Sequence, residues 1–149
     1  MKTLRYFLIF WTLFIGIGAL WGTTMMFIDP TGEMWGMEDL LYGMQVLPYS
    51  EIFFQDFIFS GIALFLVNGI FQLITAVLLF SKNKYASICG MFCGIILMLW
   101  ICLQFYIWNP NPLSNAYFIF GLLEAINGFA LYRIERKKTV QQTIENLQE

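Results

Sequence analysis

The sequence lacks histidine altogether, and charged residues make up only 12% of its 149 residues. Without histidine there is no Ser-His-Asp set and no HExxH zinc motif. The chain also contains neither a Walker phosphate-binding loop nor a dinucleotide-binding fingerprint. Its eight basic residues are too few and too scattered to indicate nucleic-acid binding. These absences exclude the common soluble enzyme classes and nucleic-acid-binding proteins.

Cysteine is scarce as well, and all three cysteines, Cys89, Cys93 and Cys102, fall in one apolar stretch. They have no histidine and no fourth soft ligand nearby, so we expect no metal site and no cofactor. A disulfide is not expected in the half of a bilayer that faces a reducing cytoplasm. We interpret the cysteines as small apolar residues that let helices approach one another.

What the chain has in abundance is apolar sequence, since 59% of its residues are hydrophobic. A helix needs about 20 apolar residues to cross a bilayer. Four stretches qualify, at 4–28, 57–80, 86–108 and 113–133. The first is longer than the apolar region of a signal peptide and no A-x-A-like cleavage site follows it, so we expect it to be retained. The pattern predicts an all-α fold, a four-helix transmembrane bundle that forms a single membrane domain over 1–149.

The charges are segregated along the chain. The basic residues occupy only three places: Lys2 and Arg5; Lys82 and Lys84; and Arg133, Arg136, Lys137 and Lys138. The connection at 29–56 contains acids but neither lysine nor arginine. By the positive-inside rule, both termini are cytoplasmic (N-in/C-in), as is the tail at 134–149, and 29–56 is an outer loop. We therefore predict a multi-pass protein of the cell membrane.

The outer loop carries a helical pattern. Asp29-Pro30-Thr31-Gly32 ends the first span, because proline and glycine do not continue a helix. Apolar residues then recur at helical spacing at Met34, Met37, Leu41 and Met44. This spacing predicts a short amphipathic helix at the outer membrane surface between spans one and two. Two interpretations stay open: the helix caps the bundle, or it is a flap over a cavity.

Small residues predict where helices touch. Gly18 and Gly22 form a small-xxx-small pair in the first span, and Ala86, Gly90 and Gly94 form a ladder in the third. Ser50 and Ser114 are candidate N-caps for the second and fourth spans. The Asn-Pro pairs at 109–112 predict a tight antiparallel hairpin of spans three and four.

Five polar residues within the spans are the candidate ligand-binding residues: Glu124, Asn68, Gln72, Asn127 and Gln104. Lipid cannot satisfy such groups, so they must face protein, water or a ligand. Glu124 and Asn68 lie near the middle of their spans, about 15 Å from each membrane surface. If spans two and four are neighbours, the spacing allows two layers, Asn68 with Glu124 and Gln72 with Asn127.

Glu124 is the only acidic residue in any of the long apolar runs, and three interpretations of it remain open. It fixes helix register through hydrogen bonds, it binds the polar part of an apolar ligand, or it relays a proton. General acid–base catalysis usually needs a second ionisable group, and the spans supply none. We therefore assign no residue a catalytic role and lean against an enzyme.

The chain also resembles a group of known proteins. Asp29-Pro30-Thr31-Gly32, then Leu47-Pro48-Tyr49-Ser50 leading into Phe53 and Asp56, then a second span with glycine and asparagine, is similar to small uncharacterised four-span bacterial integral membrane proteins. The resemblance implies a bacterial cytoplasmic membrane protein. It implies no activity and no site residues.

The function we expect is non-enzymatic: binding of a lipid-like or small apolar ligand, or of a partner membrane protein, through the bundle and outer loop. The alternative is a proton-coupled transporter or a membrane-embedded enzyme that uses Glu124. Besides the bilayer, the expected partners are the ligand or a membrane protein, and no nucleic acid. A homo-oligomer stays open, since a four-span transporter would need at least a dimer to form a path.

Overall fold

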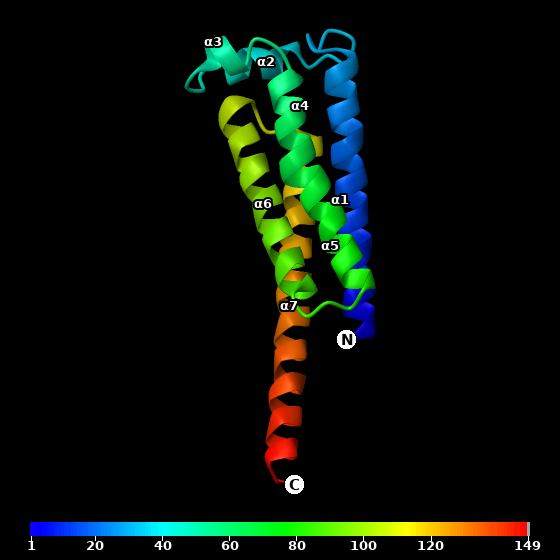
Figure 1. Cartoon of the computed structure of the whole chain (residues 1–149). Coiled ribbons are helices and arrows are strands. Elements are labelled where there is room, and N and C mark those ends of the chain that lie inside the picture. Colours follow the sequence, from blue (N-terminus) through cyan, green and yellow to red (C-terminus); the bar gives the residue numbers. More distant parts are fainter. Residues whose placement is uncertain (149) are drawn as a thin grey trace.

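The computed structural model describes residues 1–148, and they form helices with no strand (Figure 1). The helix η1 (Phe65–Ile70) is a π-helix, whose hydrogen bonds run from residue i to i+5. In chain order the elements are α1 (Lys2–Ile28), α2 (Glu38–Met44), α3 (Ser50–Phe53), α4 (Ile58–Leu64), η1 (Phe65–Ile70), α5 (Phe71–Phe80), α6 (Ala86–Ile107) and α7 (Pro112–Gln148).

Four helical segments are long and apolar enough to cross a membrane: α1, the continuous run Ile58–Phe80, α6 and α7. We call Ile58–Phe80, which joins α4, η1 and α5, span two. This confirms an all-helical multi-pass fold with four candidate spans. The tail at 134–149 continues α7 as one helix to Gln148, and Glu149 lies outside the described residues.

The four long helices form a ring around a common axis. α1 packs on span two and on α7, while α6 packs on α7 and on α5. Span two and α7 therefore stand diagonally across the bundle, one in front of the other in Figure 1. The assumption that spans two and four are neighbours is wrong, although their side chains can still meet at the axis.

The predicted hairpin of spans three and four is present as the closest helix pair, α6 and α7. A Cβ atom on Gly94 would overlap the backbone of Gly121 and Ala125, so glycine lets the two backbones touch. The N-cap of α7 is Asn111 rather than Ser114. The Asn111 Oδ1 accepts a hydrogen bond of 2.9 Å from the Ser114 backbone N–H, and Pro112 takes the first helical position.

α1 meets span two through several small residues. A Cβ on Gly16 would lie 3.1 Å from the Gln72 Cβ, and the Thr23 Oγ1 donates to the Gly61 carbonyl at 3.2 Å. Gly22 also lies against span two, since a Cβ there would lie 3.1 Å from the Leu64 Cδ2, and a Cβ on Gly18 would lie 2.8 Å from the Tyr117 hydroxyl of α7. The predicted glycine pair therefore forms close contacts inside the bundle, one with span two and one with α7, beside a cavity described below.

The connection between α1 and span two folds over one end of the bundle (Figure 1). α2 begins at Glu38, later than the pattern from Met34 predicts, and it buries Leu40 and Met44. Gly43 lies directly against the Ile107 carbonyl at the end of α6. Ser50 begins the short α3 and is not the N-cap of span two, because four unwound residues separate α3 from Ile58.

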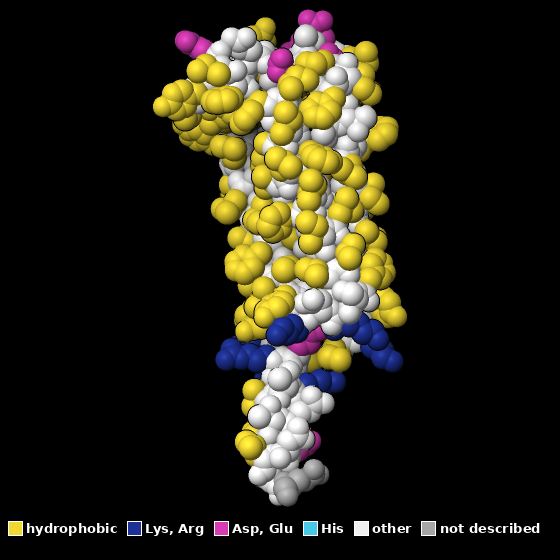
Figure 2. Space-filling view, viewed as in Figure 1, with side chains coloured by type: hydrophobic (Ala, Val, Ile, Leu, Met, Phe, Trp, Pro, Cys, Tyr) yellow, Lys and Arg dark blue, Asp and Glu magenta, His cyan; other side chains and the backbone are white. Residues whose placement is uncertain are grey.

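The basic residues gather at one end of the molecule, and most acids lie at the other. Figure 2 shows lysine and arginine in a belt at the end opposite α2, acids around α2 and α3, and hydrophobic side chains between. The exposed hydrophobic side chains include Phe7, Phe14, Trp21, Phe71 and Phe129. A band of this kind is what a lipid-facing surface requires.

Candidate ligand-binding site

The π-helix η1 interrupts span two and places Asn68 in the interior. Asn68 is only 1% exposed although it lies at the centre of an apolar segment. π-turns inside α-helices are rare and occur frequently at functional sites. Neither polar atom of the Asn68 amide has a hydrogen-bond partner among the described residues. Such a group is costly to bury, so its environment is the first place to look for a binding site.

One turn further along span two, Gln72 reaches across the bundle axis to α7. The Gln72 Nε2 donates a hydrogen bond of 2.9 Å to the Glu124 Oε2, and both side chains are almost completely buried. The Glu124 Oε1 and the Gln72 Oε1 have no partner in the described part of the chain. Gln72, not Asn68, therefore pairs with Glu124, and the predicted Asn68–Glu124 layer is wrong.

Asn127 lies on the same helix as Glu124, nearer the basic end, and bonds to a different element. Its Nδ2 donates a hydrogen bond of 3.2 Å to the Leu4 carbonyl in α1. The predicted Gln72–Asn127 layer is therefore wrong as well. The bond ties α1 to α7.

A cavity of about 250 Å³ lies beneath α2 and extends along the bundle to Asn68. Most of its wall is apolar and aromatic. The long helices contribute lining residues that include Gly18, Trp21 and Gly22 of α1, Leu64 and Asn68 of span two, Leu97, Trp100, Ile101 and Gln104 of α6, and Leu113, Ser114 and Tyr117 of α7. Met37 and Leu40 line the cavity at the end that α2 covers. The unpartnered amide of Asn68 thus lies on the wall of an apolar cavity.

The five predicted site residues divide between this cavity and the bundle interior. Gln104 also lines the cavity, and its Oε1 accepts a hydrogen bond of 3.2 Å from the Ser114 hydroxyl. Gln72, Glu124 and Asn127 are not part of the lining. Asn68 and Gln104 therefore both line the cavity, whereas Gln72 and Glu124 bond to each other in the bundle interior.

Tyr117 is a polar cavity residue that the sequence pattern did not single out. A Cβ on Gly18 would lie 2.8 Å from the Tyr117 hydroxyl, which therefore rests against α1. One signal in the sequence was the absence of a side chain at Gly18, which leaves room for a ring from another helix. Tyr117 adds a hydroxyl to the amides of Asn68 and Gln104 on the cavity wall.

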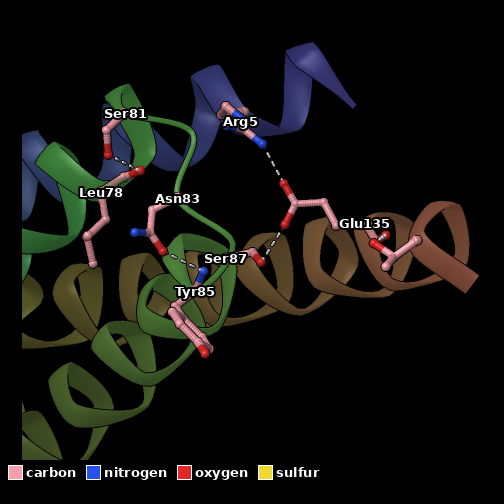
Figure 3. Close-up of polar contacts among 8 residues, drawn as sticks. Arg5, Leu78, Ser81, Asn83, Tyr85, Ser87 and Glu135 are labelled. Carbon is pink, nitrogen blue, oxygen red and sulfur yellow. Dashed lines mark hydrogen bonds and ion pairs between the residues drawn. The ribbon is translucent and has the colours of Figure 1, made fainter.

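A second polar cluster lies at the basic end of the bundle (Figure 3). Glu135 of α7 forms an ion pair with Arg5 of α1, and it accepts a hydrogen bond of 2.7 Å from the Ser87 hydroxyl of α6. Beside it, the Asn83 side chain accepts from the Tyr85 N–H in the turn before α6. Glu135 thus ties three helices together, a role hidden in the sequence by the basic residues around it.

Other candidates for a site are weaker. The hollow along α7 beyond the bundle, about 620 Å³, is lined by side chains of that one helix from Arg133 to Glu145. The buried Cys93 thiol lies 3.2 Å from the Thr75 hydroxyl, and Cys102 is exposed. Within residues 1–148, no group of three or more acidic or cysteine side chains is placed to hold a metal ion. The cavity at Asn68 is therefore the candidate site.

Comparison of the chain with family models, curated proteins and solved structures finds no match in any of the three. The resemblance to four-span bacterial membrane proteins gains no support from them.

Proposed function

We propose that this chain is a cell-membrane protein that binds a small apolar or lipid-like molecule in the cavity beneath α2. The observation that carries the proposal is the Asn68 amide, buried, unpartnered and on the cavity wall. Leaving a buried polar group without a hydrogen bond costs about 1–3 kcal/mol. A ligand with a polar atom at this position would supply the missing bond.

The rest of the cavity suits such a ligand. Binding sites for small molecules are mostly apolar, with a few placed polar groups that fix the orientation of the ligand. Here Leu97, Trp100 and Ile101 supply apolar wall, and Asn68 and Gln104 supply polar groups. The sequence left open whether α2 caps the bundle or covers a cavity. In this proposal it does both, because Leu40 packs on the bundle end and also lines the cavity.

We also propose the orientation, from charge alone. All eight basic residues lie at the end away from α2, and the positive-inside rule assigns that end to the cytoplasm. The cavity then belongs to the outer half of the bilayer. Glu124 supports the alternative of transport or catalysis less well, because it bonds to Gln72 and does not line the cavity.

The test is the lipid that copurifies with the protein. Wild type, Asn68→Leu and Asn127→Leu are extracted from their native membrane in mild detergent, and bound molecules are identified by mass spectrometry. We expect wild type and Asn127→Leu to retain one species far above its abundance in the membrane, because Asn127 does not line the cavity. Asn68→Leu should lose this enrichment. Equal retention by all three proteins would contradict the proposal.

A further inference from the structure

The most exposed residues of the cavity lining lie on α1 and α7. Of all its lining residues, only Trp21 and Leu113 are exposed, at 67% and 68%. Trp21 lies on α1 and Leu113 at the start of α7, and these two helices pack side by side. The exposed part of the cavity is therefore a mouth between α1 and α7. α2 covers the other approach through Met37 and Leu40.

Both residues at this mouth are large and hydrophobic, on the band of the molecule that faces lipid. Beside the mouth, Gly18 and Gly22 carry no side chain, and Tyr117 of α7 and Leu64 of span two lie against them. A molecule reaching the cavity by this route comes from the bilayer and not from water.

The lining is mostly apolar and carries no charged side chain. None of the cavity residues in the described part of the chain is lysine, arginine, aspartate or glutamate. The polar groups of the lining residues are the amides and hydroxyls of Asn68, Gln104, Asn111, Ser114 and Tyr117, together with the indole N–H groups of Trp21, Trp100 and Trp108. A charged group buried without an opposite charge is far more costly than a neutral polar group. This wall therefore selects against phosphate, carboxylate and ammonium groups.

The size of the cavity limits how much of a lipid it holds. Pockets that enclose a drug-sized molecule usually measure about 300–1,000 Å³. At about 250 Å³, this cavity accommodates one end of a longer molecule. The remaining chain would lie outside, in the mouth between α1 and α7.

On the basis of the proposed function, we infer that the ligand is an uncharged amphiphile that enters laterally from the bilayer between Trp21 and Leu113. Its carbonyl or hydroxyl group hydrogen-bonds to Asn68, and its hydrocarbon chain leaves through the mouth. Exchange with water across α2 is not required.

The experiment uses the full chain in phosphatidylcholine vesicles. The probe is a monoacylglycerol with a photoreactive diazirine near its glycerol ester, and labelled residues are mapped by peptide mass spectrometry. We expect labelling at Leu97 or Ile101, which are only 3% and 4% exposed and so are reached only through the cavity. 1-Oleoylglycerol should compete at least about tenfold better than 1-oleoyl-lysophosphatidic acid, the same molecule with a phosphate added.

Two variants test the route. Leu113→Trp places a larger side chain in the mouth, and Leu122→Trp makes the same change at an exposed position of α7 away from the cavity. We expect Leu113→Trp to lose interior labelling and Leu122→Trp to keep it, with both proteins equally stable to heat.

Each contrary result overturns a different statement. Equal competition by the phosphate-bearing lipid would overturn the uncharged class but leave binding in the cavity intact. Interior labelling that survives in Leu113→Trp would overturn lateral entry. If wild type shows no interior labelling with this probe, and 1-oleoylglycerol also fails to displace the copurified lipid, the proposed function itself is contradicted.

Discussion

Gln72 in α5 donates a hydrogen bond of 2.9 Å to Glu124 in α7, between two helices that stand diagonally across the bundle. The backbones of these helices pack on α1 and α6, so this bond is a direct polar link across the axis. The Gln72–Glu124 bond lies between the proposed binding site and the basic end of the bundle. We expect it to hold the bundle together rather than to contact the ligand.

Substitutions at Glu124 test this structural role. Glu124→Gln keeps an oxygen that can accept from Gln72, so we expect its free energy of unfolding to stay within about 1 kcal/mol of wild type. Glu124→Leu removes the acceptor and leaves the Gln72 amide buried without a partner, which should cost about 1–3 kcal/mol. Unfolding in mixed micelles measures both. The double variant Gln72→Leu/Glu124→Leu should recover part of the loss, and a Glu124→Leu protein as stable as wild type would contradict the prediction.

Asn68 should behave in the opposite way. Its amide has no partner among the described residues, so Asn68→Leu removes an unsatisfied group and should stabilise delipidated protein by about 1–3 kcal/mol. In the presence of ligand this gain should shrink, because wild type then forms the missing hydrogen bond. Thermal unfolding in detergent, before and after removal of copurified lipid, measures the two cases. Destabilisation of the delipidated Asn68→Leu protein would show that Asn68 already has a partner.

The cluster at Glu135 predicts a measurable coupling between α1 and α7. Arg5 and Glu135 are 18% and 22% exposed, between the values typical of surface and buried pairs. A double-mutant cycle with Arg5→Ala and Glu135→Ala should give a coupling of about 1–2 kcal/mol, because exposed pairs give about 0–1 and broken buried pairs cost about 3–5. The matched cycle of Arg136→Ala with Glu135→Ala should give a coupling near zero. Equal couplings in both cycles would refute the specific pair.

The turn after α1 predicts a dependence on pH. The hydroxyl of Thr31 donates to the Asp29 carboxylate at 2.7 Å, the Met34 N–H also donates to it, and these bonds lower the Asp29 pKa below its ordinary value of 3.8. A group whose pKa is lower in the folded state stabilises that state above its unfolded pKa. The contribution is therefore full above pH 4 and is lost as the pH falls through the folded pKa. Carboxyl NMR measures that pKa, and Asp29 titrating at or above 3.8 would contradict the prediction; Thr31→Ala should raise it.

Hydropathy alone was sufficient to predict an all-helical fold with four candidate spans. The predicted spans at 57–80 and 86–108 agree closely with Ile58–Phe80 and Ala86–Ile107, because bilayer thickness fixes how long an apolar helix must be. The hairpin of α6 and α7 was predictable as well, since Gly94 and the Asn-Pro turns are local signals. The extent of α7 beyond Arg133 was not, because nothing in a polar segment marks whether a helix continues.

The pairing of polar residues could not be predicted, and η1 is one reason. A regular helical wheel assumes one angle per residue, whereas a π-helix winds differently and changes the register of residues on either side of it. Gln72 therefore meets Glu124, while Asn68 lies on the cavity wall. The diagonal order of the helices is the other reason, since a single sequence does not state which spans are adjacent. The cavity is lined by residues of all four long helices, so it too depends on the order of the helices.

The most direct test of the account is a high-resolution structure of the protein in lipid nanodiscs made from its native membrane. We predict elongated density in the cavity, with one end within hydrogen-bond distance of the Asn68 amide and the other passing between Trp21 and Leu113. A cavity closed by neighbouring side chains, with the Asn68 amide bonded to protein, would contradict the account.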